Sequence, residues 1–178
     1  METVIPIVFI SSLVAALFVF IRSRGAISVT DPTLGFLNLA GDELSYLIDQ
    51  DRSASASLFT HVEFGAGYPI PSCDVLFIYA NVGADGSIGL GPGVTIRHLA
   101  ESAGAVIVVL ASNNPADSIV TASRLPGPKK ANLVWTIDRK GESFGCFFKE
   151  LFMRMHSGQS MPMAWVAIAR YMTSTRTA

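Results

Sequence analysis

Charged side chains and cysteines are scarce in this chain, and each shortage excludes a class of function. Only 15% of the 178 residues are charged and the formal net charge is −1, so no basic field for binding nucleic acid is present. The two cysteines, Cys73 and Cys146, are too few for a disulfide framework. The three histidines are scattered and show no metal-ligand spacing. We therefore expect neither a metal nor another cofactor.

One long hydrophobic run is present, and it lies at the amino terminus. Val4–Ile21 is an uncharged stretch of 18 residues, which as a helix spans about 27 Å, close to the minimum for a bilayer. Arg22 and Arg24 follow it, whereas Glu2 precedes it, so the positive-inside rule places the rest of the chain in the cytoplasm. We predict a single-pass membrane anchor over 1–24. A cleaved signal peptide is the alternative, but the run lacks a basic n-region and a small-x-small cleavage pattern.

The stretch Asp74–Asn114 predicts a βαβ unit. Val75–Ala80 and Val106–Ala111 are unbroken apolar runs rich in β-branched residues, typical of strands buried on both faces of a parallel sheet. Between them, Thr95–Ala103 has apolar residues at helical spacing, and Gly104 stands where a helix would end. In such a sheet, function lies at the carboxyl ends of the strands.

The rest of the chain extends this pattern into an α/β domain over 42–172 with a mainly parallel sheet. Residues 25–41 are predicted as a linker, with Pro32 and Gly35 as breakers, and 173–178 as a frayed tail. Further strands are predicted at Leu58–Phe64, near the sheet edge, and at Ala131–Ile137. Helices are predicted at Asp42–Gln50, Ala116–Ser123, Ser143–Met155, where phenylalanines form an apolar stripe, and from Ser160 onward.

Two strings in the carboxyl half suggest a family. Trp135–Asp138 is similar to a W-x-V-D string that ends a core strand, and Phe152–Ala164 reads F-x-x-M-x-x-G-x-S-x-x-x-A. In this order and spacing they resemble the CHAT domain, a caspase-related family of cysteine peptidases. The resemblance covers roughly Asp42 to Tyr171 and implies a caspase-like α/β sandwich.

The same resemblance implies that the catalytic residues are missing. The family's A-x-H-G string corresponds here to Ala80–Gly83, with Val82 in place of the histidine. Its L-S-A-C string corresponds to Leu110–Asn113, with Asn113 in place of the cysteine. Valine accepts no proton, and an asparagine amide is a poor nucleophile. The resemblance thus implies a pseudoprotease that binds another protein in a signalling or defence assembly.

The alternative is a membrane-tethered enzyme, in one of two forms. A relocated peptidase dyad would pair Cys73 or Cys146 with one of the histidines, which are His61, His98 and His156. A nucleotide site would instead use the glycine-rich stretch Gly83–Gly93, which precedes a helix amino terminus. That stretch has no lysine, and its spacing fits neither G-x-G-x-x-G nor the P-loop.

Polar side chains at the predicted strand ends form the candidate ligand or peptide pocket. Asn81, Asn113, Asn114 and Asp138 should gather at the carboxyl edge of the sheet. Asparagine and aspartate also often satisfy loop backbone and cap helices, so a structural role remains open for each of them.

Overall fold

The computed structural model describes residues 29–91, 93–115, 117, 132–137 and 143–174. The chain divides into two units, 1–30 and 31–178, and the description below concerns the second. Three predicted features lie outside the described residues: the anchor, Asp138, and the helix at Ala116–Ser123 except for Asp117. Among the helices that are described, none combines the length and the apolar character needed to cross a membrane.

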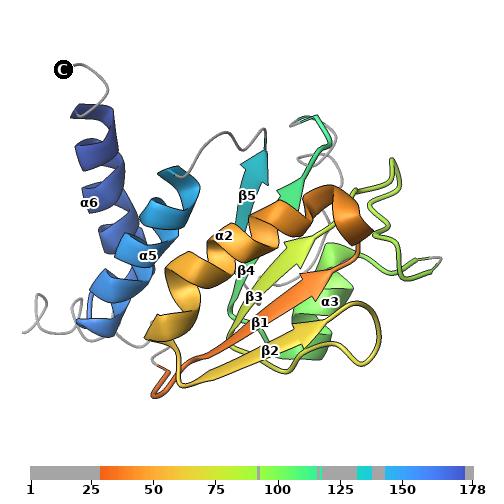
Figure 1. The fold of residues 1–178 in the computed structure, drawn as a ribbon, viewed down its shortest axis with the longest axis horizontal. Coiled ribbons are helices and arrows are strands. Elements are labelled where there is room, and N and C mark those ends of the chain that lie inside the picture. The colour runs from red at the N-terminus through yellow and green to blue at the C-terminus, as the bar shows by residue number, and fades with distance from the viewer. Residues whose placement is uncertain (1–28, 92, 116, 118–131, 138–142, 175–178) are drawn as a thin grey trace, which may run out of the picture. The chain divides into compact units, whose positions relative to one another are not determined.

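A parallel sheet forms the centre of the domain (Figure 1). Its strand order is β2-β1-β3-β4-β5, and every neighbouring pair is parallel. The predicted α/β fold with a mainly parallel sheet is confirmed. The strands are β1 Thr33–Asn38, β2 His61–Gly65, β3 Val75–Tyr79, β4 Ile107–Ser112 and β5 Asn132–Ile137.

Strand β1 corrects the predicted domain boundary. It lies inside the stretch 25–41 that the sequence predicted as a linker, and it pairs with β2 on one side and β3 on the other. Gly35 does not break this strand. A Cβ at Gly35 would lie 2.5 Å from Cys73 Sγ, so glycine is required for close packing there. Pro32 precedes the strand, where its missing N–H costs no ladder bond.

Helices cover both faces of the sheet (Figure 1). One face carries α2 and α5, and the other carries α3, while α6 packs beside α5. The helical elements are η1 Gly41–Leu44, α2 Ser45–Ser55, η2 Ala56–Leu58, α3 Ile96–Ala103, α5 Ser143–His156 and α6 Met161–Ser174. The helix predicted at Asp42–Gln50 is thus a 3-10 turn followed by a longer α-helix, and α6 extends into the predicted tail.

Helix α3 begins and ends as its sequence predicts. The Thr95 side chain accepts a hydrogen bond from the backbone N–H of His98 at 3.3 Å, which satisfies a donor in the first turn. Gly104 adopts a left-handed φ of 73° at the carboxyl end, a conformation that glycine takes without a Cβ clash.

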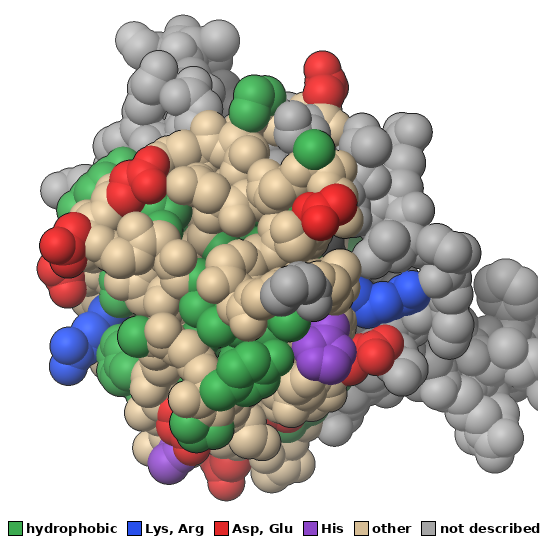
Figure 2. Space-filling view, turned by 90° about the vertical axis from the view of Figure 1, so that its right-hand side faces the viewer, with side chains coloured by type: hydrophobic (Ala, Val, Ile, Leu, Met, Phe, Trp, Pro, Cys, Tyr) green, Lys and Arg blue, Asp and Glu red, His purple; other side chains and the backbone are tan. Residues whose placement is uncertain are grey.

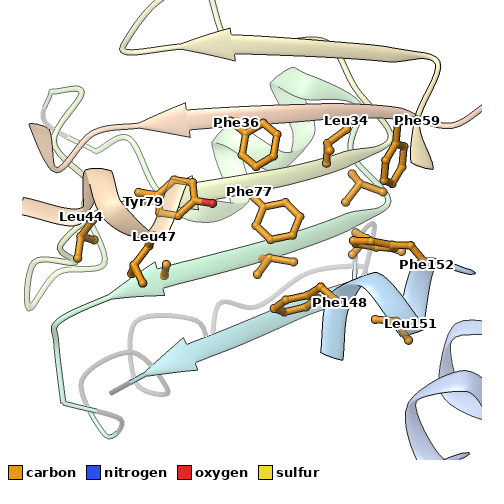
Figure 3. Close-up of a cluster of buried hydrophobic side chains, with 14 of the residues drawn as sticks. Leu34, Phe36, Leu44, Leu47, Phe59, Phe77, Tyr79, Phe148, Leu151 and Phe152 are labelled. Atoms are coloured by element: carbon orange, nitrogen blue, oxygen red, sulfur yellow. The ribbon is translucent and has the colours of Figure 1, made fainter. Parts of the chain in front are cut away.

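Aromatic side chains fill the core between the sheet and helices α2 and α5 (Figure 3). The Phe77 ring lies 5.4 Å from the Phe36 ring and 5.4 Å from the Phe148 ring. Phe152 meets Phe59 edge-on at 5.3 Å. The predicted phenylalanine stripe of α5 therefore serves the core, where each fully buried large apolar side chain contributes about 1.5–3 kcal/mol.

Candidate functional site

Three chain segments meet where β1, β3 and β4 end. Asn81 follows β3, Asn113 follows β4, and Glu43 lies in η1, which follows β1. The Asn81 amide donates to one Glu43 carboxylate oxygen at 3.1 Å, and the Asn113 amide donates to the other at 2.5 Å. All three residues are exposed. The structure therefore brings two of the predicted site residues together around a carboxylate.

Figure 2 views the molecule from the side toward which β1, β2 and β3 run in Figure 1. Among the side chains described there, Asp and Glu are dispersed over the face, and Lys and Arg lie toward its margins. The described side chains of this face therefore form no cationic cluster of the kind that holds phosphates.

Asn114 serves the fold instead of facing a ligand. Its side-chain oxygen accepts hydrogen bonds from the Val82 backbone N–H at 2.6 Å and from the Ser112 hydroxyl at 2.7 Å. Its side-chain N–H₂ donates to the Val82 carbonyl oxygen at 2.9 Å. One side chain thus satisfies both backbone groups of Val82 and ties the end of β4 to the end of β3.

The two positions that the sequence resemblance aligned with a catalytic histidine and cysteine, Val82 and Asn113, carry neither of these groups. Val82 is 5% exposed and belongs to the hydrophobic cluster between the sheet and α3. Asn113 holds Glu43. Neither the valine side chain nor the asparagine amide can supply a general base or a nucleophile at the strand ends.

The buried thiol lies away from these strand ends. Cys73 precedes β3, at the amino-terminal end of the strands, and is 5% exposed. Burial raises the pKa of its thiol from 9.0 to about 12, and the nearby charges of Asp74 and Glu63 add to this shift. Its thiol is therefore protonated at neutral pH and is a poor nucleophile. Cys146 is exposed on α5.

The histidines also have other surroundings. His61 Nε2 lies 3.0 Å from a Glu63 carboxylate oxygen on the exposed side of β2. The His156 ring packs edge-on against Phe59 at 5.7 Å, and His98 is exposed on α3. Within the described part of the chain, no hydrogen bond joins a histidine to a cysteine, which argues against the relocated dyad.

The glycine-rich loop uses its backbone amides internally. The N–H of Gly83 donates to the Ser87 carbonyl at 2.8 Å, that of Gly86 to the Gly83 carbonyl at 2.9 Å, and that of Ile88 to the Val94 carbonyl at 3.0 Å. Gly86 has a φ of 81°, a left-handed conformation that glycine adopts readily in a tight turn. Amides that are already paired do not cradle phosphate, so these three donors are not available to a nucleotide.

Asp85 organises the same loop. Its carboxylate accepts hydrogen bonds from the hydroxyl of Ser87 at 2.6 Å and from the backbone N–H of Ser87 at 3.0 Å. These bonds lower the pKa of the Asp85 carboxyl group. The loop thus carries its own anion at the centre of its turn, which further disfavours an anionic ligand there.

Glu43 is the site residue that the sequence did not reveal. With Asp42 it stands at the start of the helix predicted at Asp42–Gln50, where acidic side chains are favoured, and that position by itself accounts for an exposed acid. Glu43 lies at the strand ends because η1 begins shortly after the end of β1. If β1 had been predicted, an acidic residue soon after this strand would have indicated a place at the carboxyl edge of the sheet.

The described strand ends therefore carry hydrogen-bonding groups without a nucleophile and base pair. Within the described ranges, no three His, Cys, Asp or Glu side chains are grouped in a way that would hold a metal ion. Comparisons of this chain with models of protein families, with curated proteins and with solved structures find no match, so the structure stands as an α/β domain with a parallel sheet and no identified family.

Proposed function

We propose that this chain is a membrane-anchored, non-catalytic α/β domain of the caspase-like CHAT type that acts by binding another protein. In this proposal Val4–Ile21 holds the chain in the bilayer as a single-pass anchor, and the domain works in the cytoplasm. The exposed strand ends receive the partner in a signalling or defence assembly.

One observation carries the non-catalytic part of the proposal. Val82 is buried in the core, and Asn113 is engaged with Glu43, at the two positions where the resemblance would require a base and a nucleophile. The buried Cys73 supports the same reading because its raised pKa keeps the thiol protonated. Exposed amide and carboxylate groups at the strand ends are suited to hydrogen bonding with a partner.

Thiol labelling of the full chain in detergent tests the absence of cysteine catalysis. An activity-based electrophile and a peptide substrate library are applied to the protein and to the variants Cys73→Ser and Cys146→Ser. We expect labelling at the exposed Cys146 without any peptide turnover. Turnover that disappears with either cysteine would overturn the proposal.

Partner binding is tested with a matched pair of surface variants. Asn81→Arg with Asn113→Arg places bulky cations on the strand ends, whereas His98→Arg places one on the exposed side of α3. A partner captured from cells by the unmodified chain should be lost only with the first variant. Equal retention by all three proteins would remove the strand ends from the proposal. Alkaline carbonate extraction tests the anchor, and release of the chain into the supernatant would contradict it.

A further inference from the structure

Two side-chain amides occupy equivalent positions at the ends of neighbouring strands. Tyr79 of β3 pairs in register with Ala111 of β4, and Asn81 and Asn113 each follow two residues later. Neighbouring strands lie about 4.8 Å apart. That spacing lets two amides approach the two oxygens of one carboxylate, and this is the arrangement around Glu43.

The backbone that presents the two amides is fixed. Ala80 N–H donates to the Ala111 carbonyl at 3.1 Å, which continues the ladder beyond β3. Two residues beyond Ala80, the Asn114 side chain binds both backbone groups of Val82. These bonds fix the backbone that carries the two amides without involving Glu43, so a ligand that binds the amides has to order only the two side chains.

Glu43 reaches the amide pair from outside the sheet. It belongs to the four-residue 3-10 turn η1, and its side chain is solvent-exposed where it meets the two amides. Because the carboxylate reaches them on a flexible side chain, it can leave without breaking a strand pairing. Its release would expose two adjacent donors that face water.

We propose that Asn81 and Asn113 form a carboxylate-binding site, that Glu43 fills this site in the free domain, and that an acidic side chain of a partner protein replaces it. The inference rests on the proposed protein-binding function and names the chemistry that the partner offers. The exchange conserves the hydrogen bonds of the amide pair, because one carboxylate leaves as another arrives. Hydrogen bonds to an ionised acceptor are shorter and stronger than neutral ones, so these donors favour an acid over an amide.

The internal carboxylate should make binding weak until it is removed. A group tethered by a short segment competes at an effective concentration in the millimolar range or above. Replacing Glu43 by alanine should therefore raise the affinity for an acidic ligand about tenfold or more. Asp42 lies next to Glu43 in the same exposed turn and provides a control, since Asp42→Ala removes one negative charge without freeing the amides.

The test follows the side-chain amide signals of the isotope-labelled full chain in detergent during a peptide titration. The probe is a capped pentapeptide, Ala-Ala-Asp-Ala-Ala, and the control peptide has asparagine in place of aspartate. We expect Glu43→Ala to bind the acidic peptide at least about tenfold more tightly than the unmodified chain. Adding Asn113→Ala to that variant should abolish the gain, and Asp42→Ala should leave the affinity close to that of the unmodified chain.

Three results would overturn the inference. These are an absence of binding to Glu43→Ala, an equal gain with Asp42→Ala, or equal binding of the two peptides. If Glu43→Ala no longer unfolds cooperatively on heating, Glu43→Gln takes its place in the titration. Glutamine removes the competing charge and keeps nearly the same side-chain shape. The titration measures binding alone, so its failure leaves the non-catalytic proposal standing. Peptide turnover, if it were found, would overturn the non-catalytic proposal. The titration would still decide whether the carboxylate site exists.

Discussion

Changing Asn114 to aspartate should destabilise the domain, even though the two side chains have nearly the same shape. In the folded chain the Asn114 amide oxygen faces the Val82 N–H and the Ser112 hydroxyl, while its N–H₂ faces the Val82 carbonyl. An ionised carboxylate keeps the first two bonds but has no hydrogen for the third. Two acceptor oxygens would then face each other about 2.9 Å apart.

The expected cost follows from what is lost. One hydrogen bond contributes about 0.5–1.5 kcal/mol, and a partly buried carbonyl left without its donor costs about 1–3 kcal/mol more. We therefore expect Asn114→Asp to lower the free energy of unfolding by about 2–4 kcal/mol at pH 7. The loss should shrink at pH 4, because a protonated carboxyl group can again donate to the Val82 carbonyl.

Urea denaturation monitored by circular dichroism measures this change, and the neighbouring residue supplies the matched control. Asn113→Asp makes the same chemical change one position away, where the side chain is exposed and meets only the exposed Glu43 carboxylate among the contacts described. That variant should lose less than about 1 kcal/mol, because solvent screens exposed charges and Glu43 can turn away. Equal losses at the two positions would refute the role assigned to Asn114.

Four further predictions concern buried groups. Tyr79→Phe removes a 2.7 Å hydrogen bond to the buried Asp51 carboxyl group and should lower the free energy of unfolding by about 1–3 kcal/mol; an unchanged urea midpoint would contradict this. Gly35→Ala brings a Cβ within 2.5 Å of Cys73 Sγ and should cost about 1–3 kcal/mol, of which Cys73→Ala in the same chain should recover a part, whereas strictly additive losses would exclude the clash. Because burial raises the pKa of Cys73 from 9.0 to about 12, its contribution to stability is complete below pH 9 and is lost as the pH rises toward 12. At pH 8 iodoacetamide should modify the exposed Cys146 and spare Cys73 in the native chain, and mass spectrometry that found Cys73 modified first would contradict its burial.

The central βαβ unit could be predicted because its signals are local. Strands β3 and β4 are buried along their whole length, and such strands appear in a sequence as unbroken apolar runs. Helix α3 has its own start and stop at Thr95 and Gly104. The gathering of Asn81 and Asn113 followed from the rule that parallel strands end at one edge.

Strand β1 could not be predicted because the residue that explains the glycine within it lies elsewhere in the chain. Its glycine reads locally as a breaker, and only the approach of Cys73 explains it. Because β1 was not predicted, the position of Glu43 next to the strand ends was not predicted either. The inward role of Asn114 was equally inaccessible, because two adjacent asparagines look alike in sequence and only the fold decides which one meets Val82.

The interior position of β1 has a consequence for biosynthesis. This strand leaves the ribosome before both of its neighbours, since β2 and β3 follow it in the chain. At about 5–20 residues per second, β1 waits on the order of seconds for its partners. During that interval its apolar side chains and both ladder edges are open to wrong pairing. Residues 33–38 therefore lack one of their two pairing strands until β3 has been made.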